Sequence, residues 1–217
     1  DRPNSPLAAV DEDYSTDSYL LESEGPTFFI VTNKEAPNQK LVKATAKHPN
    51  EEYWTDVIPE TENVLSVSSG GGYFFARYMI DAITKVVQYN FKGKNIRQVD
   101  LPGVGTARGW NGKMEQKKLY YSFTNYHTPG VIYAFDADSG KSEQYWSPDI
   151  DFNPEDYISS QIFYTSADGT KVPMIITHKK GIEYDGKNPP ILYGQGPANL
   201  SSPPEYSIPT GARIDNT

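Results

Sequence analysis

Cysteine is absent from this sequence of 217 residues. Disulfide bonds and thiolate metal sites are therefore excluded, while the cytoplasm and the periplasm both stay open as compartments. No apolar run approaches the roughly 18 residues of a membrane span. The first residues, Asp1-Arg2-Pro3-Asn4, lack the pattern of a signal peptide and a starting methionine. We expect the chain to begin inside a longer product or after a processing cut.

Basic residues are too few to balance the acidic ones. The chain has 20 Lys and Arg against 28 Asp and Glu, a net charge of -8. This charge disfavours nucleic acid and anionic membrane surfaces as partners, because both attract a basic face. Part of the excess lies near the N-terminus, at Asp11, Glu12, Asp13, Asp17, Glu22 and Glu24. Their spacing matches no calcium loop, so a solvated acidic segment is the favoured interpretation.

Helical periodicity is also hard to find anywhere in the chain, whereas aromatic residues are abundant. They make up 13% of the sequence, with 16 Tyr, while the mean hydropathy is only -0.62. Strands with one wet face use such rings because they pack well on a pleated surface. The composition therefore predicts a mainly β protein and argues against disorder over most of its length.

A repeat appears when the aromatic pairs are aligned. Predicted strands contain Phe28-Phe29, Phe74-Phe75 and Tyr120-Tyr121, at steps of 46 residues. A second set contains Leu41-Val42, Val86-Val87 and Val131-Ile132, at steps of 45. A turn signal follows each member of the second set, at His48-Pro49-Asn50, Lys92-Gly93-Lys94 and Asp138-Ser139-Gly140. A period of about 45 residues built from short strands is typical of β-propeller blades.

Three hairpins of a β-sandwich are the alternative interpretation, but the constant spacing favours propeller blades. Three blades cannot close a ring, since propellers have about four to eight. We therefore expect a partial β-propeller whose other blades lie upstream of Asp1. Its unpaired strand edges predict that the isolated chain self-associates or binds its missing part.

Proline-containing segments near Pro148 and Pro154 predict a domain boundary at about residue 150. We assign residues 1–150 to the C-terminal blades and 151–217 to the first strands of a second domain. In the second segment, residues 161–164 and 172–176 are predicted to pair across a turn at 167–170. A further strand is predicted at 189–193, and no periodic pattern is found at 211–217.

The search for catalytic chemistry finds little. The elbow pattern G-x-S-x-G, which would expose a nucleophilic serine, does not occur. The candidate bases are His48, His127 and His178, each of which is expected to be a surface or capping residue. They form no zinc signature, and no metal or cofactor is predicted. Carboxylates near residue 150 leave a glycosidase as a third hypothesis, supported by nothing else.

Three segments carry a resemblance to a known family. They are Thr32–Leu41, Phe123–Tyr133 and, most specifically, Ser166–Gly181 with its Ala167-Asp168-Gly169-Thr170 turn. Together with Leu192–Asn199 they resemble the prolyl oligopeptidase family of serine peptidases, over about residues 26–207. The resemblance implies a seven-bladed propeller up to about residue 150, followed by the first β-strands of an α/β-hydrolase domain.

The same resemblance implies a function for the parent protein. In the family, the propeller caps the active site and admits short peptides, which the hydrolase domain cleaves after proline or after basic residues. The Ser-Asp-His triad lies downstream of the matched region, so none of it falls in this chain. We therefore expect a serine endopeptidase as the parent and no activity from this chain alone.

The matched region departs from the family at one functional loop. The family has Tyr-Gly-Tyr-Gly-Gly-Phe-Asn where this chain has residues 193–199. By this resemblance, Gln195 occupies the position of the oxyanion-stabilising Tyr, and Ala198 that of a Phe lining the proline pocket. A Gln N–H can also donate to an oxyanion, while Pro197 removes a backbone N–H. Altered specificity, reduced activity and an altered chain end all fit these changes, as does a non-catalytic peptide-binding or assembly module.

Overall fold

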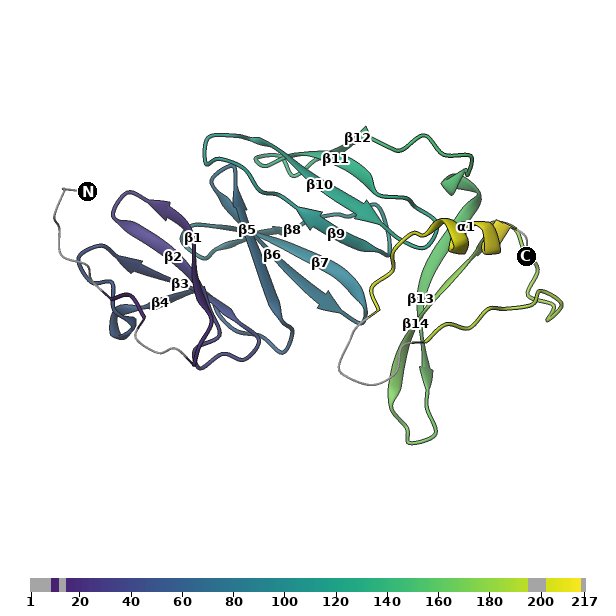
Figure 1. The fold of residues 1–217 in the computed structure, drawn as a ribbon, viewed down its shortest axis with the longest axis horizontal. Helices are drawn as coiled ribbons and strands as arrows, with labels where there is room; N and C mark the ends of the chain where they lie inside the picture. The colour runs from purple at the N-terminus through teal and green to yellow at the C-terminus, as the bar shows by residue number, and fades with distance from the viewer. Residues whose placement is uncertain (1–8, 12–14, 195–201, 216–217) are drawn as a thin grey trace. The chain divides into compact units, whose positions relative to one another are not determined.

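A computed structural model describes residues 9–11, 15–194 and 202–215. The described part is mainly β and contains the strands β1 to β14, two short 3-10 helices and the helix α1 (Figure 1). No helix in this part of the chain is both long enough and apolar enough to cross a membrane. The prediction of a mainly β protein is confirmed.

Twelve of the strands form three four-stranded sheets, in each of which sequence neighbours lie side by side. The first sheet contains β1 (Ser18–Glu24), β2 (Thr27–Thr32), β3 (Lys40–Thr45) and β4 (Thr55–Ile58). The second contains β5 (Leu65–Gly70), β6 (Tyr73–Ile80), β7 (Ile83–Asn90) and β8 (Asn95–Gln98). The third contains β9 (Thr106–Gly109), β10 (Lys118–Thr124), β11 (Val131–Asp136) and β12 (Ser142–Trp146).

The predicted repeat coincides with these sheets. Each aromatic pair lies on the second strand of a sheet, and each aliphatic pair lies on the third strand. The three turn signals fall between the third and fourth strands. At one of them, Gly93 has a φ of +80°, and a Cβ there would lie 2.4 Å from the backbone oxygen of Val57. Only glycine satisfies both conditions without strain.

An extra residue interrupts the fourth strand of each four-stranded sheet. The register against the third strand shifts at Leu41/Val42, Gln88/Tyr89 and Ile132/Tyr133. The residues left without a partner in the ladder are Val57, Ile96 and Tyr145. Such bulges bend a strand and increase its twist.

The chain divides into two compact units. One contains residues 1–78, 86–98 and 111–117, and the other contains residues 79–85, 99–110 and 118–217. In the first unit, the buried rings of Phe29 and Phe74 meet edge to face at 4.8 Å, and Phe91 stacks on Phe74 at 4.5 Å. In the second unit, Trp110 stacks on Tyr121 at 4.4 Å. Aromatic pairs of this kind contribute beyond their buried area.

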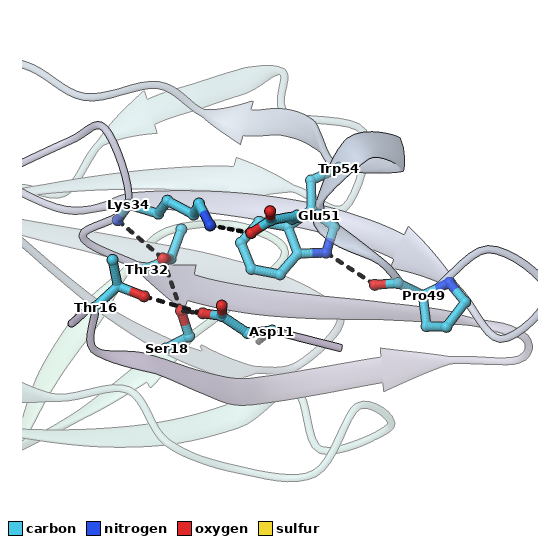
Figure 2. A network of polar contacts seen from close by, with 8 residues as sticks. All are labelled: Asp11, Thr16, Ser18, Thr32, Lys34, Pro49, Glu51 and Trp54. Carbon is cyan, nitrogen blue, oxygen red and sulfur yellow. Dashed lines mark hydrogen bonds and ion pairs between the residues drawn. The ribbon is translucent and has the colours of Figure 1, made fainter. Parts of the chain in front are cut away.

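A polar network in the first unit includes one of the predicted solvated acids, Asp11 (Figure 2). Its carboxylate accepts hydrogen bonds from Thr16 at 3.1 Å and Ser18 at 2.7 Å. The Ser18 hydroxyl lies 2.8 Å from that of Thr32, which is fully buried. The ammonium of Lys34 pairs with Glu51 in the same network. Asp11 therefore accepts hydrogen bonds from hydroxyl groups at the start of β1 and just before it.

Beyond the third sheet, a hairpin forms as predicted. Strands β13 (Tyr157–Thr165) and β14 (Lys171–Lys179) pair in antiparallel register, with Ile162 opposite Met174. At the turn, the Gly169 N–H donates to the Ser166 oxygen at 2.9 Å, and Gly169 has a φ of +88°. The turn residues Asp168-Gly169 supply this geometry, as the sequence indicated.

Two predictions for the C-terminal part are wrong. Residues 189–193 form no strand, and Leu192 and Tyr193 are 85% and 76% exposed. Pro189 and Pro190 lack N–H groups, and the described residues offer this segment no partner strand. Conversely, α1 spans Ile208–Asp215, where no helix was predicted. Ser207 precedes the helix and its Oγ accepts the Thr210 N–H at 3.3 Å, while Pro209 lies in the first turn. Both features favour the helix despite Gly211.

Candidate functional site

Gln195 and Ala198, the predicted oxyanion and proline-pocket positions, lie outside the described residues, as does Pro197. Their roles therefore stay predictions.

Just before them in the sequence, Tyr193 lies close enough to Tyr126 to affect the ionisation of Tyr126. Burial raises the pKa of Tyr126, and the Tyr193 phenol raises it further. Tyr193 therefore lies within electrostatic range of Tyr126, which follows β10.

The three histidines have different surroundings. His48 is exposed in the β3–β4 connection, with its ring 4.7 Å from Tyr53. His178 lies on β14, where its Nε2 is 2.7 Å from the Tyr184 hydroxyl. His127 is half-buried and contacts Ser159, a possible nucleophile by residue type.

His127 belongs to a loop that starts at the last residue of β10 and that we call the anchor loop, residues 124–130. Its conformation depends on Asn125, which is 3% exposed. The Asn125 side-chain oxygen accepts the N–H groups of His127 at 3.0 Å and Thr128 at 2.7 Å. Its amide donates to the Val104 oxygen at 3.1 Å. A buried Asn with these three bonds fixes the turn.

A short chain of polar groups runs from the anchor loop into the hairpin. Nδ1 of His127 lies 2.9 Å from Oγ of Ser159, which lies 2.7 Å from Oγ1 of Thr177. Burial lowers the pKa of His127; Glu155 opposes this shift, and Lys180 adds to it. The distance suits a serine–base pair, but no carboxylate among the described residues accepts a hydrogen bond from this ring. The geometry of this chain of polar groups supports a role in connecting the anchor loop to the hairpin.

A second connection joins the third sheet to the segment before α1. The buried Thr106 hydroxyl donates to the Pro204 oxygen at 2.9 Å. The Tyr206 N–H donates to Thr124 Oγ1 at 3.1 Å, and Arg108 pairs with Glu205 at 3.3 Å on the surface. Sequence reasoning missed this connection and the partners of His127, because the residues lie 97, 82 or 32 positions apart.

The first unit has a cavity of about 460 Å³. Its lining includes Phe29, Lys43, His48, Phe91 and Lys92. Thr45 also lines it, and its hydroxyl accepts a hydrogen bond from the backbone N–H of His48 at 3.3 Å. Within the described ranges, no three His, Asp or Glu side chains gather in a way that could hold a metal ion.

Three successive four-stranded sheets in sequence order place the chain in the class of β-propeller proteins. Residues 1–148 match the family model described as the prolyl oligopeptidase N-terminal β-propeller domain. The chain therefore belongs to the prolyl oligopeptidase family of serine peptidases.

Curated relatives agree with this assignment. The chain is 52% identical over 197 residues to a prolyl endopeptidase of Elizabethkingia miricola, and 49% identical to one of Elizabethkingia meningoseptica. Both alignments cover 91% of this chain but 28% of the relative. The chain thus spans less than a third of the length of these relatives.

Solved structures show the same relationship. The apo form of prolyl oligopeptidase B from Galerina marginata has a TM-score of 0.83 at 25% identity, covering 94% of this chain and 30% of that one. A prolyl endopeptidase from a study of inter-domain dynamics in catalysis and specificity has a TM-score of 0.76 at 33% identity. That match covers 94% of this chain and 31% of the neighbour.

Proposed function

We propose that this chain is part of a prolyl-cleaving serine endopeptidase that hydrolyses short peptides. The observation that carries the proposal is the 52% identity to a prolyl endopeptidase over 91% of the chain. In this proposal, the propeller restricts substrate access and the catalytic Ser-Asp-His residues belong to the rest of the protein. The chain alone is therefore inactive.

The proposal divides the chain at about residue 150, with 1–150 as the last blades and 151–217 as the first strands of the α/β-hydrolase domain. The end of the family-model match at residue 148 supports the boundary. The separate pairing of β13 with β14, which joins none of the three sheets, supports it as well.

A fluorophosphonate probe tests the function directly. The native protein is labelled in extracts of its source, and its intact mass is measured. We expect a polypeptide several times heavier than 24.3 kDa that carries one adduct, because the probe modifies an activated serine. An unlabelled product near the mass of this chain would contradict the proposal. Labelling after heat denaturation is the control for nonspecific reaction.

We also propose that Gln195 donates a side-chain N–H to the oxyanion of the tetrahedral intermediate. Loss of one such donor typically lowers kcat by about 10²–10³. Gln195→Ala in the full-length enzyme should therefore reduce kcat in this range with a small change in KM. Gln195→Tyr, which restores the family residue, should retain activity. A Gln195→Ala enzyme with unchanged kcat would contradict the role.

Ala198 has a related role in the proposal. An aromatic wall is replaced by a methyl group, so the pocket for proline should be less selective.

The alternative function is a peptide-binding or assembly module without chemistry, which the changes at Gln195, Pro197 and Ala198 favour. Tight peptide binding by a full-length protein that the probe leaves unlabelled would support this alternative.

A further inference from the structure

The side chain of His127 connects the anchor loop with strand β13 of the hairpin and, through Ser159, with strand β14. Its ring contacts Ser159 on β13, and Ser159 contacts Thr177 on β14. Ser159 and Thr177 are direct cross-strand partners. The imidazole therefore meets the hairpin where its two strands are paired.

The anchor loop holds this ring in a defined position. The Asn125 bonds fix the backbone at His127 and Thr128. On the other side, the Thr124 hydroxyl donates to the Thr128 oxygen at 2.9 Å. Because the anchor loop is held by hydrogen bonds at both ends, little conformational entropy is lost when the His127 ring contacts Ser159.

Two charged groups from neighbouring elements face the ring. Glu155 lies on the short helix Pro154–Asp156, and Lys180 directly follows β14. Their effects on the imidazolium are opposite in sign, and the effect of burial exceeds both. Glu155 also adds to the effect of burial in raising the pKa of Tyr133, on β11. The folded junction consequently favours the neutral imidazole.

We propose that His127 is an acid-sensitive latch. Its neutral imidazole holds the β13–β14 hairpin against the third sheet, and its protonated form releases the hairpin. In the neutral form, Nδ1 can accept a hydrogen bond from the Ser159 hydroxyl, and the Ser159 oxygen can accept one from the Thr177 hydroxyl. A proton from solvent turns Nδ1 into a donor. The Ser159 hydroxyl must then accept a hydrogen bond from Nδ1 and turn its own proton away from the ring, and a new positive charge lies near Lys180.

The direction of the pH effect follows from the lowered pKa. A histidine that favours the neutral form when folded stabilises the junction fully above the ordinary pKa of about 6.5. This contribution is lost as the pH falls through the lower pKa of the folded state. The latch concerns contacts within this chain, so it stands or fails independently of peptidase activity.

Native-state hydrogen exchange on the full-length protein tests the latch. Protection factors, which correct for intrinsic exchange, are compared between about pH 8 and about pH 5, on either side of the ordinary histidine pKa. We expect protection of residues 157–160 and 176–179 to fall about two- to tenfold, the equivalent of one hydrogen bond. Strand β11 is the internal reference and should change little. Equal protection of the hairpin at both pH values would overturn the proposal.

Variants separate the latch from general acid effects. His127→Asn keeps a hydrogen-bonding amide but cannot titrate, so the pH response should disappear. Ser159→Ala should lower protection at both pH values, also without a pH response. The matched control is His178→Gln, which changes the histidine on the same hairpin that contacts Tyr184, and the response should persist. A response that survives in His127→Asn would refute the latch, even if Ser159→Ala failed to fold.

Discussion

Asp168 illustrates how a single exposed side chain orders a turn. The Ser166 hydroxyl donates to its carboxylate, and the Thr170 N–H donates to the same oxygen at 3.0 Å. These bonds favour the ionised form. They lower the pKa of Asp168 to about 2, with the Ser166 hydroxyl as the largest cause.

Ser166→Ala should therefore raise the pKa of Asp168 towards its ordinary value of 3.8. Because the folded pKa is depressed, the turn is most ordered above the ordinary value and loses order as the pH falls towards about 2. A carboxyl NMR titration measures both effects. Ser160→Ala, in the same strand pair but away from the turn, is the control. An unchanged Asp168 titration in Ser166→Ala would contradict the assignment.

Individual site residues were only partly predictable. The position of His127 in a loop and of His178 on a strand followed from local turn and strand signals. The contact of His127 with Ser159 did not, because it depends on how a loop and a hairpin pack in three dimensions. Gln195 and Ala198 were identified through family resemblance alone.

At the scale of elements, the second and third strands of each sheet were predictable because they carry paired apolar residues. The first and fourth strands were not predicted. Strand β12, for example, is exposed along its whole length and has no alternating pattern. The helix α1 was missed because Gly211 weakens the helical signal, while packing against Tyr206 fills the space beside that glycine.

The segment before α1 gives a prediction for one element. Thr106→Val keeps the shape of the side chain but leaves the buried oxygen of Pro204 without its donor. We expect a loss of about 1–3 kcal/mol in the free energy of unfolding and faster cleavage near residues 202–207. Urea unfolding and limited proteolysis measure these effects. Thr165→Val, at an exposed strand end, should change neither; equal effects of both substitutions would refute the role of Thr106.

At the scale of the molecule, the repeat period predicted the propeller, while the acidic charge disfavours nucleic acid as a partner, which stays a prediction. Three sheets fall short of the four or more that close a ring. The 217-residue chain expressed alone should therefore associate with itself, through strand edges and rings such as Tyr145 and Trp146, which are 61% and 50% exposed.

Light scattering at increasing concentration measures this association. Tyr145→Lys with Trp146→Lys should reduce it, because charges on an edge strand oppose pairing. A monodisperse monomer at high concentration would contradict the prediction that the chain self-associates through its open strand edges.

The extra residue in the fourth strand of each sheet affects how the repeats are compared. The bulged residues Val57, Ile96 and Tyr145 lie opposite different points of the third strand, because the shifts at Leu41/Val42, Gln88/Tyr89 and Ile132/Tyr133 do not keep the 45-residue step of these strands. Val57 is 5% exposed and Tyr145 is 61% exposed. Because side chains alternate between faces, an alignment that omits one of these residues exchanges inward and outward positions along the rest of the strand. Substitution patterns in these strands are therefore meaningful only when the bulge of each repeat is placed at its own position.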